Sequence, residues 1–211
     1  MHAQSTLTQF LDDLAARAPT PGGGSASAVG GALGAALGSM AAVYTCGNEK
    51  FKHVEAQAAA LDKSFAALRL KFLDLMQQDV DAYAAYSSAR ALPRATPEEK
   101  QARKAAMDAS NEAATIVPLK IGAACEDGIR FVEELSAIVN PNLAGDVASS
   151  AYFLEAAARG AAIQVFSNCA TDDITGVSAA RRADAKGFVN RCQNARERIH
   201  ETVLKFLKVP A

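Results

Sequence analysis

The sequence has no tryptophan, only four cysteines and almost no net charge. Without an excess of basic residues, neither nucleic acid nor an anionic membrane surface is expected as a partner. The cysteines and the three histidines are widely separated, so no short spacing indicates a metal site. We therefore predict no metal, a reducing cytoplasm as the location, and buried free thiols at Cys46, Cys125, Cys169 and Cys192.

Two further patterns are missing from the sequence. The first residues lack the basic and then apolar order of a signal peptide. No segment alternates apolar and polar residues for long enough to form a convincing strand. Half of the 211 residues are hydrophobic, which is enough to bury one substantial core. We predict an all-α protein with a single domain over residues 1–211, built as a multi-helix bundle.

The most distinctive stretch is the Ala/Gly-rich segment 26–42, which lies in a region without charge. Gly30, Gly34 and Gly38 recur every four residues and leave one helix face nearly bare, so another helix can approach closely. That packing must offset about 1 kcal/mol of helix propensity per glycine. A membrane span is the alternative, but few Leu, Ile or Phe residues are present. We predict a helix buried on all sides, with a subunit interface as one place for its bare face.

A glycine-rich loop, Thr20-Pro21-Gly22-Gly23-Gly24-Ser25, precedes this helix. The glycines let backbone N–H groups approach a bound group, and Ser25 is predicted to cap the helix. The helix dipole adds partial positive charge at the same place. The loop is either a cradle for an anion or carbonyl group, or a flexible entry to the helix. It lacks the Lys-Ser/Thr pair of a phosphate-binding loop.

Helical periodicity dominates the rest of the chain. Apolar residues spaced by three and four predict a long amphipathic helix over 54–91. Thr96-Pro97-Glu98-Glu99 is a capping box that opens the next helix, and Pro118 is expected to kink or break that helix. Lys100 and Arg103 follow the box, where they either meet an anionic substrate tail or remain solvated. Further helices are predicted over residues 5–17, 119–139, 145–166 and 183–207.

Asp79 is the first candidate for chemistry. It shares a helix face with Tyr83, four residues later, whereas Asp81 points away. If that face is buried, the pKa of Asp79 rises, which suits proton transfer near neutral pH. A structural or solvated role is the alternative.

A second candidate group consists of Asn140, Asp146, Gln164 and Asn168. Gln164 and Asn168 share a face of an otherwise apolar helix, where amides must find hydrogen-bond partners. The group either binds a ligand or forms a buried network. Asp146 alone also fits a carboxylate at the start of a helix.

Together these motifs resemble the cyclodeaminase/cyclohydrolase family of folate enzymes, over nearly the whole chain. That family comprises the cyclodeaminase domain of formiminotransferase-cyclodeaminase and stand-alone methenyltetrahydrofolate cyclohydrolases of bacteria. The resemblance is carried, in order, by Ala18 to Ser25, Gly31 to Leu37, Met40, Asp79 to Tyr83, Leu92-Pro93, Thr96 to Lys100, Val117 to Leu119, and Asn140 with Asp146.

The resemblance implies an all-helical, homodimeric enzyme that acts on a tetrahydrofolate carrying a one-carbon unit and needs no cofactor. It implies a cleft near the dimer interface for the pterin and Asp79 as the proton donor and acceptor. The substrate-binding residues that it implies are Gly22, Gly23, Gly24, Ser25, Tyr83, Asn140, Asp146, Gln164 and Asn168.

Two positions depart from the family pattern: Gly145, where the family usually has serine, and Gln164, where it has asparagine. We expect both departures to affect the substrate and the exact reaction more than the fold. We expect hydrolysis of 5,10-methenyltetrahydrofolate to 10-formyltetrahydrofolate, since no formiminotransferase segment accompanies the motifs. Cyclodeamination of formiminotetrahydrofolate, with loss of ammonia, is the alternative reaction. A non-catalytic folate-binding or helical interaction protein is the alternative of another class.

Overall fold

The computed structural model describes residues 5–169 and 175–208. Over these residues the chain forms α-helices and short 3-10 helices and no strand, which confirms the all-α prediction. The α-helices are α1 (Leu7–Ala15), α2 (Gly23–Thr45), α3 (Glu55–Ala91), α4 (Pro97–Ser136), α5 (Ala144–Asn168) and α6 (Val177–Leu207), with 3-10 helices at Glu49–Val54 and Pro141–Leu143.

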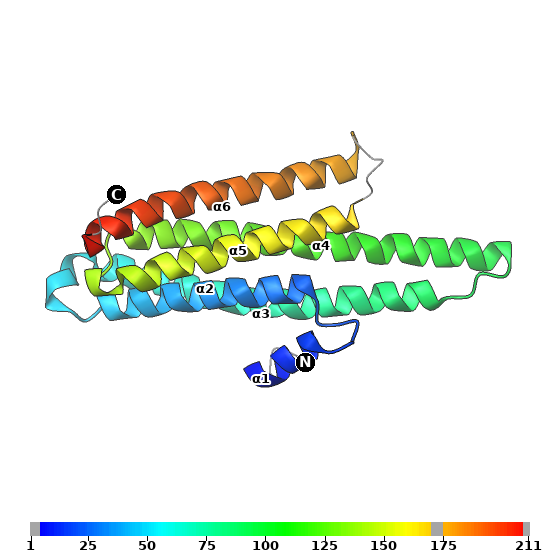
Figure 1. The fold of residues 1–211 in the computed structure, drawn as a ribbon, viewed down its shortest axis with the longest axis horizontal. Helices are drawn as coiled ribbons and strands as arrows, with labels where there is room; N and C mark the ends of the chain where they lie inside the picture. The colour runs from blue at the N-terminus through cyan, green and yellow to red at the C-terminus, as the bar shows by residue number, and fades with distance from the viewer. Residues whose placement is uncertain (1–4, 170–174, 209–211) are drawn as a thin grey trace.

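Helices α2 to α6 lie along one common axis (Figure 1). Helix α2 packs against α3, α4 and α5, and α6 covers α4 and α5. The short helix α1 lies on the side of the bundle and inserts Phe10 into the core. The C-terminal end of α3 and the N-terminal end of α4 project beyond the other helices (Figure 1). We call residues 87–110 the arm.

The predicted capping box is confirmed at the start of α4. The Thr96 side chain accepts a hydrogen bond from the backbone N–H of Glu99, and the Glu99 carboxylate accepts one from the backbone N–H of Thr96. This reciprocal pair satisfies N–H groups that the first turn leaves open. The boundary between α3 and α4, and with it the length of the arm, therefore follows from local sequence.

Helix α2 packs closely through its glycines, and both neighbours belong to the same chain. A β-carbon at Gly34 would lie 2.7 Å from Cγ of Leu154 on α5, and one at Gly38 would lie 2.5 Å from the Phe65 ring on α3. The glycine stripe therefore does not form a subunit interface, because α3 and α5 occupy it. Nor is α2 buried on all sides, since Leu33 and Tyr44 are 46% and 65% exposed.

Helix α2 is also the one described helix long and apolar enough to cross a bilayer, judged by length and composition alone. Its mean hydropathy is 1.5 over the relevant window, and half of that window is buried inside the bundle. The core helix of a globular bundle has the same properties, and the packing of α2 against α3 and α5 is that of a core helix.

Pro118 does not break α4, which continues to Ser136. Proline has no N–H group, so the carbonyl of Ala114, four residues earlier, lacks its helical donor. The side-chain amide of Asn168 on α5 donates to this carbonyl at 2.8 Å. The predicted break is therefore wrong, and the acceptor that proline leaves open is satisfied by a neighbouring helix.

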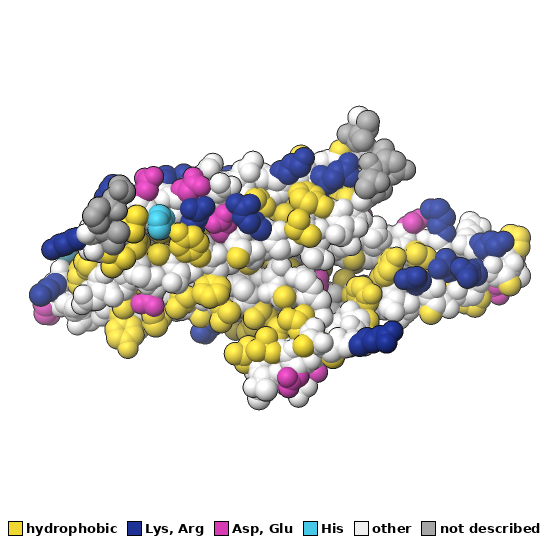
Figure 2. Space-filling view, viewed as in Figure 1, with side chains coloured by type: hydrophobic (Ala, Val, Ile, Leu, Met, Phe, Trp, Pro, Cys, Tyr) yellow, Lys and Arg dark blue, Asp and Glu magenta, His cyan; other side chains and the backbone are white. Residues whose placement is uncertain are grey.

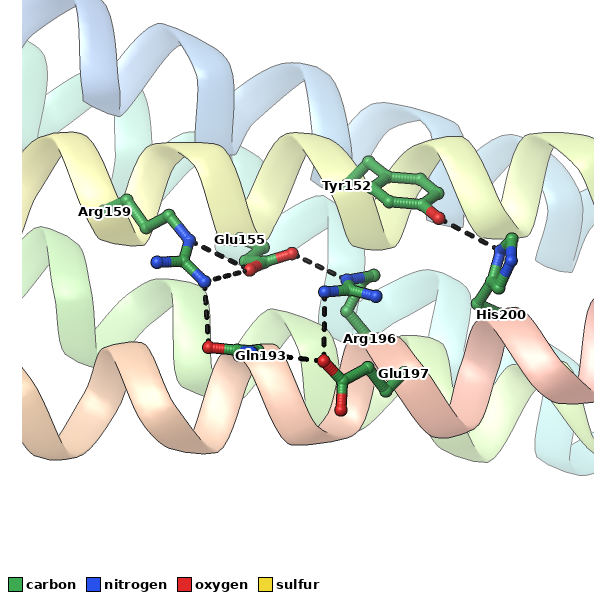
Figure 3. A network of polar contacts seen from close by, with 7 residues as sticks. All are labelled: Tyr152, Glu155, Arg159, Gln193, Arg196, Glu197 and His200. Atoms are coloured by element: carbon green, nitrogen blue, oxygen red, sulfur yellow. Dashed lines mark hydrogen bonds and ion pairs between the residues drawn. The ribbon is translucent and has the colours of Figure 1, made fainter.

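Helices α5 and α6 are joined by a polar network around the buried Glu155 (Figure 3). Its carboxylate accepts hydrogen bonds from Arg159 on α5, at 2.7 and 2.9 Å, and from Arg196 on α6, at 2.7 Å. Burial alone would raise the pKa of Glu155, but these bonds and the positive charge of both guanidinium groups hold that pKa below its usual range. The buried carboxylate is thus paired, as its burial requires.

The cysteine prediction is confirmed for Cys125, Cys169 and Cys192, which are buried, and is wrong for Cys46, which is partly exposed at the end of α2. All four are free thiols. Burial raises the pKa of Cys192 to about 12, so this thiol stays protonated and unreactive.

Candidate active site

A cleft of about 300 Å³ lies where the N-terminus of α2 meets the middle of α3, the α4 helix and the C-terminal end of α5. Most of the predicted site residues line it, although they come from distant parts of the sequence. The lining residues are Pro19, Thr20, Gly22, Gly23, Gly24, Asp79, Tyr83, Tyr86, Asn111, Ala114, Gln164, Ser167 and Asn168.

Asp79 is the one carboxylate that lines this cleft in the described part of the chain. The Ser25 hydroxyl donates a hydrogen bond to Oδ2 of Asp79 at 2.7 Å, and the Ser25 backbone N–H donates a second. Ser25 itself is fully buried. The carboxylate is thus fixed from the α2 side and presents its remaining lone pairs to the cleft.

Burial raises the pKa of Asp79 above its ordinary value of 3.8, and the two hydrogen bonds from Ser25 oppose this rise without cancelling it. A carboxyl group with a raised pKa accepts and returns a proton more readily near neutral pH than an ordinary aspartate. The face of α3 that carries Asp79 is thus partly buried, as proton transfer by this residue requires.

The glycine loop allows α2 to begin directly beside Asp79. A β-carbon at Gly24 would lie 2.6 Å from Cγ of Asp79 and closer still to Oδ1. Helix α2 begins at Gly23 with Gly22 as its N-cap, so the predicted capping by Ser25 is wrong. Ser25 lies within the first turn, where its hydroxyl faces Asp79 instead of an open N–H group. The first N–H groups of the helix have no acceptor within it, which favours partial negative charge in the cleft.

Gln164 closes the cleft from the α5 side. A β-carbon at Gly23 would lie 2.5 Å from Nε2 of Gln164, so the side-chain amide rests directly on the start of α2. The long amide arm therefore reaches across the cleft, and a β-carbon at position 23 would force this amide to move.

Shortening this arm tests the departure from the family pattern. The Gln164→Asn variant should keep its activity within about tenfold, because the shorter amide still projects from the same position on α5. Steady-state kinetics measure the change, and circular dichroism checks the fold. A complete loss of activity with intact helicity would show that the site depends on glutamine.

Asn168 is held by two contacts with α4. Its side-chain amide donates to the Ala114 carbonyl, and its backbone carbonyl accepts a hydrogen bond from Nδ2 of Asn111 at 3.2 Å. The end of α5 is thereby tied to α4 at the rim of the cleft. Asn168 has a positioning role in this structure, alongside any contact with a ligand.

Asn140 and Asp146 do not join the other predicted residues within the chain. Asn140 caps the 3-10 helix that precedes α5, and Asp146 lies in the first turn of α5. Eighteen residues separate Asp146 from Gln164, which is about 27 Å along the helix axis. Asn140 Oδ1 accepts from the Asn142 N–H, and the Asn140 N–H donates to Oγ1 of Thr45 at 3.2 Å. The predicted group of four is therefore two pairs at opposite ends of a straight helix.

Six lining residues were not among the predicted site residues, namely Pro19, Thr20, Tyr86, Asn111, Ala114 and Ser167. Tyr86 lies seven residues after Asp79, two helical turns along the same face, so its periodicity was a usable signal. Asn111 had no such signal, because the face of α4 that meets the cleft is set by its packing on α3 and α5.

The structure offers no obvious metal ligands in the ranges 5–169 and 175–208, where no group of three His, Cys, Asp or Glu side chains lies together. The prediction of a site without metal or cofactor therefore stays a prediction.

The sequence is similar to known folate enzymes. Residues 6–185 match the model of a family described as formiminotransferase-cyclodeaminase. A methenyltetrahydrofolate cyclohydrolase of Methylorubrum extorquens is 36% identical, over 96% of this chain and 98% of its own. The formimidoyltransferase-cyclodeaminase of Rattus norvegicus is 34% identical over 81% of this chain, which matches only 32% of that longer protein.

The fold is similar to that of a solved structure. The crystal structure of formiminotetrahydrofolate cyclodeaminase from Thermotoga maritima superposes with a TM-score of 0.78, over 99% of this chain and 98% of that one. The two sequences are 24% identical, so this similarity is one of fold.

Proposed function

Because the chain belongs to the formiminotransferase-cyclodeaminase family, we propose that it is an enzyme that hydrolyses 5,10-methenyltetrahydrofolate to 10-formyltetrahydrofolate. The similarity to a cyclohydrolase extends over nearly the full length of both chains. The observation that carries the proposal is the Asp79 carboxylate, held by Ser25 at the base of a cleft with a helix N-terminus beside it.

The reaction needs a group that first takes and then returns a proton. Water adds to the methenyl carbon between N5 and N10, and Asp79 accepts the proton that this water loses. The hydroxyl group on this carbon then loses its remaining proton to solvent, the bond from carbon to N5 breaks, N5 takes the proton from Asp79, and the carbon stays on N10 as a formyl group. One proton is released overall, because the methenyl substrate is a cation and the product is neutral. A raised pKa at Asp79 suits both transfers.

The remaining cleft residues hold the reactants in place. The open N–H groups at the start of α2 favour the partial negative charge that develops on the oxygen of the tetrahedral intermediate. Gln164 from α5 and Asn111 from α4 add side-chain amides to the lining of the cleft. Such groups lower the barrier because they are fixed before the reaction begins.

Assays with two substrates separate the candidate functions. The purified chain, without added cofactor, is given 5,10-methenyltetrahydrofolate or formiminotetrahydrofolate, and loss of the methenyl chromophore and release of ammonia are measured. The Asp79→Asn variant supplies the background rate. Hydrolysis supports the proposal, and ammonia release indicates a cyclodeaminase. Neither activity would point to a folate-binding or helical interaction protein.

We also propose a homodimer formed through the apolar face. This face consists of the exposed residues Leu33 and Tyr44 on α2 and Phe153 and Ile163 on α5, between 42% and 65% exposed. Helix α2 contributes no charged residue to it, and hydrophobic side chains cover the same region in Figure 2. A second copy of this face is the partner that best matches its exposed apolar side chains.

A charge on this face should separate the subunits. The Leu33→Glu variant is expected to be a monomer at micromolar concentration, because the interface would bury an unpaired carboxylate. Val177→Glu is the matched control, since it places the same charge at another exposed apolar position, the start of α6. Native mass spectrometry measures both variants. A wild-type monomer at the same concentration contradicts the proposed dimer.

A further inference from the structure

The face of α3 that holds Asp79 continues along the arm. Asp79, Tyr83, Tyr86 and Arg90 are spaced by four, three and four residues, so all four lie on one face of the helix. Asp79 and the two tyrosines line the cleft, whereas Arg90 lies beyond its rim. Along this face the side chains thus change from a carboxylate to aromatic rings and then to a cation.

Helix α4 brings a second cation to the same place. Arg103 Nε donates to the backbone carbonyl of Arg90 at 3.2 Å, so its guanidinium group crosses from α4 to the end of α3. This contact uses one of the five N–H donors of Arg103. Arg90 has no ion pair with any residue in the described ranges. Both guanidinium groups therefore retain donors for an anion.

The arm as a whole carries an excess of basic residues. Lys and Arg side chains gather on it in Figure 2, and residues 87–110 contain five of them against three acidic residues. One glutamate, Glu99, is occupied by the capping box. The arm is thus a local positive region on a chain whose net charge is close to zero.

The cleft holds only part of a folate. Its volume of about 300 Å³ lies at the lower end of the range for small-molecule sites, so a bound folate must extend out of it. Arg90 lies eleven residues beyond Asp79, which is about 16 Å along the helix axis. An extended folate places its glutamate carboxylates at a comparable distance from the pterin, with the aminobenzoyl ring between them. The exposed Tyr83 ring and the Tyr86 ring, with centroids 6.3 Å apart, occupy that middle position.

We propose that Arg90 and Arg103 bind the carboxylates of the folate glutamate tail, with the two tyrosines beside the aminobenzoyl ring. The inference rests on the proposed function, because it requires the pterin to lie at Asp79. It assigns the arm a role in substrate recognition and makes the affinity for substrate depend on a negatively charged tail.

Two substrates that differ only in the tail test this inference. 5,10-Methenyltetrahydropteroate retains the heterocycle and the aminobenzoyl ring but lacks glutamate. In the wild-type protein its KM should exceed that of 5,10-methenyltetrahydrofolate. Arg90→Gln and Arg103→Gln should each raise KM for the folate by about fivefold and leave KM for the pteroate unchanged. The kcat for both substrates should remain the same, since neither arginine contacts the reacting atoms.

Lys104→Gln is the matched control, because it removes the same charge from the neighbouring position on α4. Lys104 is paired with Asp108 at 2.6 Å, and its loss should leave KM for both substrates unchanged. Equal KM values for the two substrates in the wild-type protein, or equal effects of the arginine variants on both, would overturn the inference. If neither substrate is hydrolysed, the proposed function fails instead. Titration calorimetry with tetrahydrofolate and tetrahydropteroate then tests whether the protein binds the glutamate tail. Equal affinities for the two compounds would contradict the inference.

Discussion

Replacing Asp79 by asparagine should lower kcat by about 100- to 10,000-fold while folate still binds, because the amide keeps the shape of the carboxylate but cannot accept the proton from water. The carbonyl oxygen of the introduced amide can still accept the hydrogen bond from the Ser25 hydroxyl, so the cleft should keep its form. Steady-state kinetics give kcat and KM separately. Near-normal turnover with a raised KM would show that Asp79 binds substrate and does not transfer the proton.

The same substitution should make the folded protein more stable at neutral pH. Burial raises the pKa of Asp79 in the folded state, so folding favours the protonated form. This contribution to the free energy of unfolding is fully present below the ordinary value of 3.8 and is lost as the pH rises through the raised pKa. The advantage of Asp79→Asn should therefore grow over that window and then level off. Urea unfolding of both proteins at several pH values measures it, and an advantage that shrinks as the pH rises contradicts the assigned direction.

Gly24→Ala should lower kcat/KM by about a hundredfold with little loss of stability. The new β-carbon would lie 2.6 Å from Cγ of Asp79. The carboxylate must therefore move away and lose its hydrogen bond from the Ser25 hydroxyl. A displacement of about 1 Å in a catalytic group is enough for an effect of this size. Alanine is also the better helix former, which offsets part of any strain.

Gly145→Ala is the matched control for this variant. Gly145 is the second residue of α5, as Gly24 is of α2, and nothing lies within 4 Å of a β-carbon placed there. Its activity should match that of the wild type. Thermal unfolding of both variants checks the fold. Full activity in Gly24→Ala would mean that Asp79 does not depend on close contact with α2.

Features that depend on nearby residues were predictable from the sequence. The long α3 helix has an apolar periodicity that alone defines its buried face, and the capping box at Thr96 marks the start of α4. Asp79 and Tyr83 share a face for the same local reason. The position of Asp79 in a cleft was a condition of the prediction, which only the packing of α2 against α3 could meet.

Features that depend on a second helix were not predictable in this way. The sequence favours Ser25 as a cap, but the serine faces Asp79, which is 54 residues away along the chain. Asn140 and Asp146 match the family motif, but the motif does not show how far these residues lie from the cleft. The length of α5 separates them from it. Asn111 became a candidate only once α4 and α5 were placed side by side.

The pairing of Pro118 with Asn168 has an evolutionary consequence. Proline leaves the Ala114 carbonyl without a helical donor, and the Asn168 amide satisfies it. If a residue with an N–H group replaced the proline, that carbonyl would regain its own helical bond and the amide would lose its acceptor. Selection should therefore act on the two positions jointly. Among relatives, loss of proline at the first position should accompany loss of the amide at the second, so an alignment would show the pair covarying.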